Sequence, residues 1–238
     1  MEQITAPLSA PMSGWDRFVF TFLNADVASR YWVEIASGLG VTLLAGGAVV
    51  VTGIGGGAAL AAVRSLERKW LNVPIMIYVD IFRAIPPLAL ILVLFFGLPN
   101  IGIMLPSFVV LWLSLSLVLA AFCEEVFWAG ITAVNKGQWQ AARSTGLTFG
   151  QTLFWVIFPQ AVRLAIPPLT NRTISITKNL ALGSAIGMNE ILGRANAALS
   201  MSSNATPLTI GAALYVLIFI PLIIASRRLE RRYAWGGH

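Results

Sequence analysis

Six charged side chains lie inside long apolar stretches or at their edges: Asp80, Arg83, Glu124, Glu125, Arg172 and Lys178. An ionisable group inside a bilayer is costly, so such groups are usually paired or functional. Asp80 and Arg83 are three residues apart, so on one helix they share a face and can form an ion pair. Glu124 and Glu125 are neighbours that point about 100° apart on a helix, so they cannot both serve one spot.

Two interpretations of Glu124 and Arg172 are open. In the first, the two form a salt bridge between helices and are structural, as are Asp80, Arg83, Glu125 and Lys178. In the second, Arg172 offers its cation to the carboxylate of a substrate bound near the middle of the membrane. The residues of this candidate substrate site are Glu124, Asn171, Arg172, Thr173 and Ser175.

Helices that cross a membrane are the elements that must position these side chains. Of the 238 residues, 57% are hydrophobic and 11% are charged, whereas a soluble domain carries about 25% charged residues. Three runs contain no Asp, Glu, Lys or Arg, and each exceeds the roughly 20 residues that a span needs. We therefore expect an all-α membrane protein with about five spans, at residues 35–63, 73–98, 105–129, 161–185 and 208–226.

Lysine and arginine are distributed unevenly between the two sides of these spans. The loops after the first and third spans and the C-terminal tail hold nine of them, and the opposite side holds three. This bias predicts that the side with nine faces the cytoplasm, with the N-terminus outside and the C-terminus inside. The net charge of +6 therefore indicates membrane orientation rather than a nucleic-acid partner.

The ends of the chain are expected to be short additions to the membrane domain, residues 35–230. Residues 1–34 lack the pattern of a signal peptide, so we interpret them as a periplasmic or interfacial lead-in, and 231–238 as a cytoplasmic tail. Cys123 is the only cysteine, which excludes an intrachain disulfide and predicts a packed core thiol. His238 is the only histidine and is terminal, so no metal site is expected. Nothing indicates catalysis.

A polar segment, GQWQAARSTGLTFGQTLFWVIFP, interrupts the apolar chain at residues 137–159. We expect a short helix over Gln138–Arg143 on the cytoplasmic surface and a turn at Gly146. An apolar return should then be stopped or kinked at Pro159. Such a helix exposes small alanines that can seat in a groove of another protein, although an ordinary loop is the alternative.

The spacing of this segment resembles the EAA loop of the permease subunits of bacterial ABC importers. That pattern is Glu-Ala-Ala, three residues, Gly, nine residues and Ile-x-Leu-Pro. The matching residues here are Gln140, Ala141, Ala142, Gly146 and Pro159, with glutamine in place of the usual glutamate. Segments 34–44, 78–99, 120–142 and 167–192 are similar to permeases for polar amino acids, and the resemblance covers about 34–233.

The resemblance implies a type I ABC importer permease fold with a cytoplasmic coupling helix, in the bacterial inner membrane. It implies two ATPase subunits that bind ATP and Mg²⁺, a second permease subunit, identical or different, and a periplasmic binding protein. The chain itself would carry no cofactor, and it lacks a phosphate-binding P-loop. The substrate would be a polar amino acid or a close derivative, with a slight lean to acidic ones. The rival functions are a membrane scaffold and a channel or carrier outside the ABC class.

Overall fold

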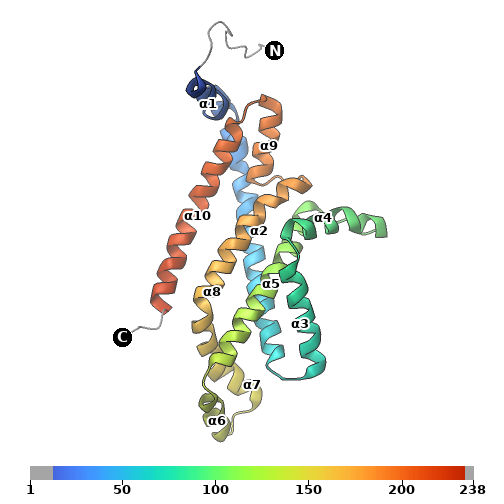
Figure 1. The fold of residues 1–238 in the computed structure, drawn as a ribbon, viewed down its shortest axis with the longest axis vertical. Coiled ribbons are helices and arrows are strands. Elements are labelled where there is room, and N and C mark those ends of the chain that lie inside the picture. The colour runs from blue at the N-terminus through green and yellow to red at the C-terminus, as the bar shows by residue number, and fades with distance from the viewer. Residues whose placement is uncertain (1–12, 234–238) are drawn as a thin grey trace.

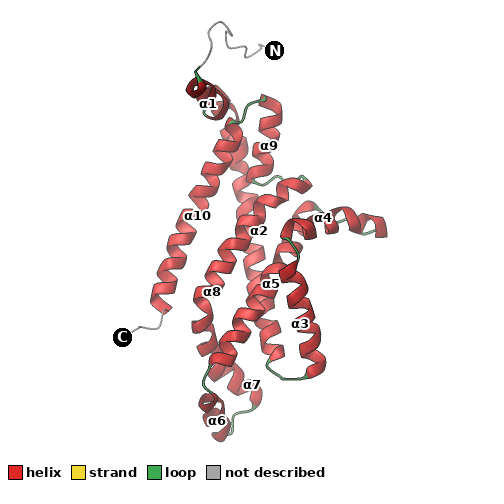
Figure 2. Ribbon diagram, in the orientation of Figure 1, coloured by secondary structure: helices red, strands yellow, loops and turns green. Residues whose placement is uncertain are grey.

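The computed structural model describes residues 13–233, and every element in that range is a helix (Figures 1 and 2). In chain order these are α1 (Gly14–Phe22), α2 (Ala25–Arg64), α3 (Lys69–Ala84), α4 (Pro87–Gly97), η1 (Leu98–Ile101), α5 (Ser107–Ala133), α6 (Lys136–Ser144), α7 (Phe149–Gln151), η2 (Thr152–Ile157), α8 (Phe158–Lys178), η3 (Asn179–Ile186), α9 (Ile191–Ser202) and α10 (Thr206–Tyr233). Within this range, four helical runs are long and apolar enough to cross a bilayer, and a fifth results if α3 and α4 form one bent span. The predicted all-α fold with about five spans is confirmed.

The 40-residue helix α2 runs along the bundle, and α5 packs against it over much of its length (Figure 1). Small residues on α2 allow this close approach, because a Cβ atom on Gly53 or Gly57 would overlap α5. At Gly57 the added atom would lie 2.4 Å from the Cβ of Cys123 and 2.8 Å from the carbonyl oxygen of Ala120. Cys123 is fully buried at this contact, as predicted. Helices in lipid associate through such close packing.

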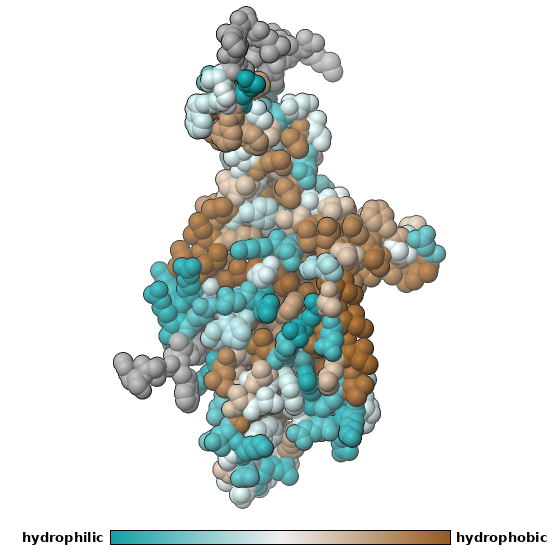
Figure 3. Space-filling model, in the orientation of Figure 1, coloured by the Kyte–Doolittle hydropathy of each residue, from teal (hydrophilic) through white to brown (hydrophobic). Residues whose placement is uncertain are grey.

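The second expected span, 73–98, is not one straight helix. It is divided into α3 and α4, whose axes differ by 100°. Ile85 and Pro86 are extended, and Pro87 begins α4. A proline disfavours helical geometry in the residue before it, so two consecutive prolines end α3 and begin a new helix. Figure 3 shows apolar side chains along the projecting α4.

The polar segment between α5 and α8 lies at the far end of the bundle from α1 and α9 (Figure 1). It forms α6, followed by a turn in which Gly146 has a φ of +87°, as the sequence predicted. Pro159, however, does not stop the returning helix. The π-helical turn η2 leads directly into α8, and Pro159 lies in its first turn. The expectation that Pro159 would stop the helix is therefore wrong, and a proline beside a π-turn is a usual site for the alternative that was expected, a kink.

The expected borders of the membrane domain do not coincide with breaks in structure. Helix α2 begins at Ala25 and runs through residues 34 and 35, and α10 continues beyond residue 230 to Tyr233. Residues 1–12 of the lead-in and 234–238 of the tail lie outside the described residues.

Candidate functional site

A cavity of about 260 Å³ lies where the α3–α4 bend meets α5 and the end of α8. Its floor on α5 is formed by Val118 and Phe122, close to the middle of that 27-residue helix. Its polar lining comes from Arg83, Arg172, Ser175 and Asn179. This cavity, called the Arg172 pocket below, brings together residues that are about 90 positions apart in the sequence.

Two guanidinium groups flank one aromatic ring in this pocket. The guanidinium carbon of Arg172 lies 4.6 Å from the centre of the Phe122 ring, and that of Arg83 lies 5.6 Å from it. Arg83 also donates to Glu125 at 2.8 Å. Arg172 forms no ion pair with any carboxylate in residues 13–233. The pocket therefore holds one guanidinium paired with a carboxylate and one, on the exposed side chain of Arg172, that lies over an aromatic ring and has no carboxylate partner within residues 13–233, an arrangement suited to an incoming carboxylate.

The salt bridge between Glu124 and Arg172, one of the two interpretations left open by the sequence, is wrong, and Glu124 does not line the Arg172 pocket. The carboxylate of Glu124 is fully buried and accepts bonds from Arg64 Nη1, at 3.0 Å to Oε1 and 3.2 Å to Oε2. Arg64 also lies over the Trp128 ring at 4.6 Å. The expected first span ended at residue 63, which placed Arg64 in the loop that follows. In the structure Arg64 is the last residue of α2, and its side chain extends to Glu124 on α5.

The predicted pair between Asp80 and Arg83 is wrong as well. Arg83 bonds to Glu125 on α5, so it links two helices instead of two turns of its own helix. Asp80 is exposed on α3, and within the described chain no ion pair joins it to Arg83.

The other predicted substrate residues divide between two faces of α8. Ser175 lines the Arg172 pocket, whereas Thr173 lines a separate groove against α10. Asn171 is exposed and lines neither cavity, and Lys178 is exposed at the end of α8. Residues two apart on a helix point in nearly opposite directions, so helix geometry separates Thr173 from Ser175.

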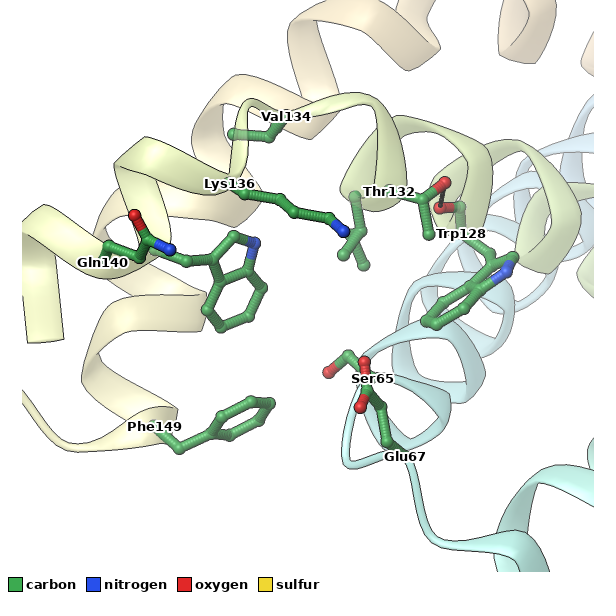
Figure 4. A pocket seen from close by; sticks show the side chains of 10 residues that line it. Ser65, Glu67, Trp128, Thr132, Val134, Lys136, Gln140 and Phe149 are labelled. Carbon is green, nitrogen blue, oxygen red and sulfur yellow. Dashed lines mark hydrogen bonds between the residues drawn. The ribbon is translucent and has the colours of Figure 1, made fainter.

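The residues of the polar segment form a surface around α6. Gln140 and Ala141 are exposed, but Ala142 is buried against the bundle, contrary to the expectation that both alanines would be exposed. A cavity of about 440 Å³ lies beside Gln140, with Glu67 and Lys136 on its walls (Figure 4). Trp139 and Phe149 stack next to it, with ring centres 5.3 Å apart, and fix α6 relative to α7.

A buried polar cluster at the opposite end of the molecule was missed from the sequence. Glu190 is fully buried and caps α9, accepting from the backbone N–H of Leu192 at 2.9 Å and of Gly193 at 2.6 Å. The hydroxyl of Tyr215 on α10 also donates to it. Burial raises the pKa of Glu190, and these hydrogen bonds oppose the rise. The only signal was a glutamate directly before an apolar helix, the usual place for an N-cap.

The family described as "Binding-protein-dependent transport system inner membrane component" matches residues 34–235. The chain belongs to this family. A relative from Bacillus subtilis (strain 168), described as a probable glutamine ABC transporter permease protein, GlnM, is 36% identical over 180 residues, which cover 74% of this chain and 82% of the relative. The L-cystine transport system permease protein TcyB of the same organism is 30% identical over 212 residues, covering 87% and 89%.

Two solved structures share the fold. The chain of a structure described as an amino acid ABC transporter with histidines is 30% identical, with a TM-score of 0.77 and coverage of 86% of this chain and 96% of that one. An inward-facing MetNI methionine ABC transporter gives a TM-score of 0.63 at 21% identity, covering 93% and 99%. The family and these structures confirm the type I importer permease fold predicted from the EAA spacing.

Proposed function

We propose that this chain is the permease subunit of a bacterial ABC importer that moves a polar amino acid from the periplasm to the cytoplasm. The family match and the descriptions of the relatives, which name glutamine and cystine transport, support an amino-acid substrate. The bias of lysine and arginine supports a cytoplasmic position for α6 and the end of α10, with the N-terminus in the periplasm. The chain itself is a transport subunit and not an enzyme.

The observation that carries this proposal is the guanidinium of Arg172, which lines the Arg172 pocket and has no carboxylate partner within residues 13–233. A cavity of about 260 Å³ is smaller than the roughly 300–1,000 Å³ of sites for drug-sized ligands, which suits a molecule as small as an amino acid. In this proposal Arg172 binds the α-carboxylate, and Ser175 and Asn179 offer hydrogen bonds to polar groups of the substrate.

The same pocket distinguishes two substrate classes. A neutral polar amino acid needs only Arg172 and leaves the Arg83–Glu125 pair intact. An acidic amino acid, the class toward which the sequence leans slightly, would bring a second carboxylate to Arg83 in competition with Glu125. We therefore propose that Glu125→Gln favours acidic over neutral substrates, because it removes the charge that neutralises Arg83.

In this proposal, α6 transmits the movement of the ATPase subunits to the permease. Its exposed residues Gln140 and Ala141 would seat in a groove of one of two ATPase subunits, which bind ATP and Mg²⁺. A second permease subunit completes the pathway, and a periplasmic binding protein delivers the substrate. Gln140 is uncharged where the family pattern has glutamate, so its contact with a cation would be a weaker hydrogen bond.

The test reconstitutes the permease with its ATPase and binding protein and measures ATP hydrolysis with glutamine, cystine, arginine or glutamate present. We expect one polar amino acid to stimulate ATP hydrolysis by the native complex. The same amino acid should not stimulate hydrolysis by the complex that carries Arg172→Ala. A scaffold or a carrier outside the ABC class would show no stimulated ATPase activity with any of them, and that outcome would overturn the proposal.

A further inference from the structure

Another cavity lies between α8 and α10, on the face of α8 away from the Arg172 pocket. Its volume is about 490 Å³ and its walls are almost entirely apolar. The side chains that form most of the walls are Ile54, Ile166, Leu169, Ile174, Leu222 and Leu229. We call this cavity the α8–α10 groove. An apolar slot of this size in a membrane-spanning bundle is suited to hydrocarbon rather than to a polar substrate.

One end of the groove carries an excess of positive charge. Helix α10 ends in four exposed arginines at positions 227, 228, 231 and 232, and Figure 3 shows hydrophilic side chains gathered over the lower part of α10. Arg232 follows Leu229 by three residues, so it shares the groove side of α10. Arg163 precedes Ile166 by three residues and is exposed on the groove side of α8.

The charge at this end is not cancelled within the described part of the chain. Neither Arg163 nor Arg232 forms an ion pair among residues 13–233. Glu230 is the one acidic residue in the last two turns of α10, and its carboxylate accepts a 2.5 Å hydrogen bond from Thr170 across the groove. The rim therefore keeps exposed guanidinium groups on both of the helices that form the groove.

We propose that the α8–α10 groove binds one anionic phospholipid of the cytoplasmic leaflet. An acyl chain fills the apolar walls, and the guanidinium groups of Arg163 and Arg232 bind the phosphate. Guanidinium matches phosphate in geometry as well as charge, and anionic lipids bind basic pockets between helices on the cytoplasmic side. The inference rests on the proposed orientation, with the end of α10 in the cytoplasm, but not on the amino-acid substrate.

The test uses the purified full chain after delipidation, with native mass spectrometry to count bound phosphatidylglycerol or phosphatidylcholine. The native chain is expected to retain one phosphatidylglycerol and no phosphatidylcholine under the same conditions. The double variant R163Q/R232Q should lose phosphatidylglycerol binding by at least fivefold. The matched control R227Q/R231Q removes the same charge, but each position is two residues from Leu229 and points away from the groove, so binding should persist.

A groove-filling variant, Leu229→Trp, tests the apolar part and should also displace the lipid. Equal losses in the two double variants would mean that positive charge binds the lipid without a specific site. Equal retention of both lipids would mean that the charge of the headgroup does not matter. Either result would overturn the proposal. A second copy of the chain is the rival occupant. Disulfide crosslinking between two chains through Leu229→Cys, in a Cys123→Ser background, would show that a protein helix fills the groove and would also overturn it. Because the assay needs no ATPase and no transport, its failure is distinguishable from failure of the proposed function.

Discussion

The guanidinium carbon of Arg172 lies 4.6 Å from the centre of the Phe122 ring, while the nearby Arg83 is held by Glu125. Both guanidinium groups lie near the same aromatic ring, but within residues 13–233 only Arg83 has a carboxylate partner. An ionisable side chain in a membrane-spanning segment is usually paired or functional, and Arg172 has no carboxylate partner within residues 13–233, so it is a candidate for binding a ligand.

Replacing Arg172 with alanine is expected to raise the KM for the amino acid at least tenfold. The substitution removes the group that binds the substrate carboxylate, and within residues 13–233 Arg172 forms no ion pair that folding would lose. Arg172→Lys keeps the positive charge, so its KM should lie between that of the native protein and that of Arg172→Ala. Uptake kinetics of the reconstituted transporter measure both. An unchanged KM in folded Arg172→Ala, judged by its elution as a single species, would remove Arg172 from the site.

The Arg64–Glu124 pair is expected to matter for stability. Arg64→Met leaves the fully buried carboxylate of Glu124 without its cation, and loss of one partner of a buried pair costs about 3–5 kcal/mol. The double variant R64M/E124L replaces both by apolar groups and should recover most of the loss. Thermal unfolding in detergent measures the series.

The exposed Arg83–Glu125 pair is the matched control for that experiment. Its side chains are 33% and 46% exposed, whereas Glu124 is fully buried, so Glu125→Gln should destabilise the protein less than Arg64→Met does. If Arg64→Met and Glu125→Gln lower the melting temperature equally, burial is not what makes the Arg64–Glu124 pair important.

Two glycines of α2 provide a second pair of stability variants. Gly57→Ala should destabilise the bundle, because its methyl group would lie 2.4 Å from the Cβ of Cys123 and force α2 away from α5. Gly55→Ala meets nothing within 4 Å and should be neutral or slightly stabilising, since alanine favours a helix. Melting temperatures compare them, and a Gly57→Ala protein as stable as the native one would contradict the close contact of α2 with α5.

Gln140 tests the coupling surface. Because it is exposed and lines the cavity beside α6, its substitution should not disturb the fold. We expect Gln140→Glu to leave substrate-stimulated ATPase activity within about twofold of the native level, since a glutamine can still hydrogen-bond to a cationic partner. A large rise would instead show that the glutamine limits coupling.

Much of the fold could be predicted from hydropathy and motif spacing, because both are local. Runs without charged residues predicted the spans. Gly146 predicted a turn, which is confirmed by its positive φ. The double proline at 86–87 was visible too, but hydropathy alone merges α3 and α4 into one span. The opposite directions of Thr173 and Ser175 followed from helix geometry and were overlooked.

The partner of Glu124 could not be predicted in the same way. Arg64 is 60 residues away, and which cation reaches the carboxylate depends on how α2 is rotated against α5. That rotation is set by contacts such as Gly57 against Cys123, which no local pattern specifies. The expected stop at Pro159 is wrong because the chain enters α8 through a π-turn, which no local pattern indicates.

Amino-acid uptake into proteoliposomes tests the central claim most directly. The permease is reconstituted with its ATPase and binding protein, with the binding protein outside and ATP enclosed, and radiolabelled polar amino acids are supplied. The account predicts accumulation of one of them that requires ATP and is lost in Arg172→Ala. Accumulation that follows an ion gradient without ATP, or no accumulation of any amino acid by an assembled complex, would contradict it.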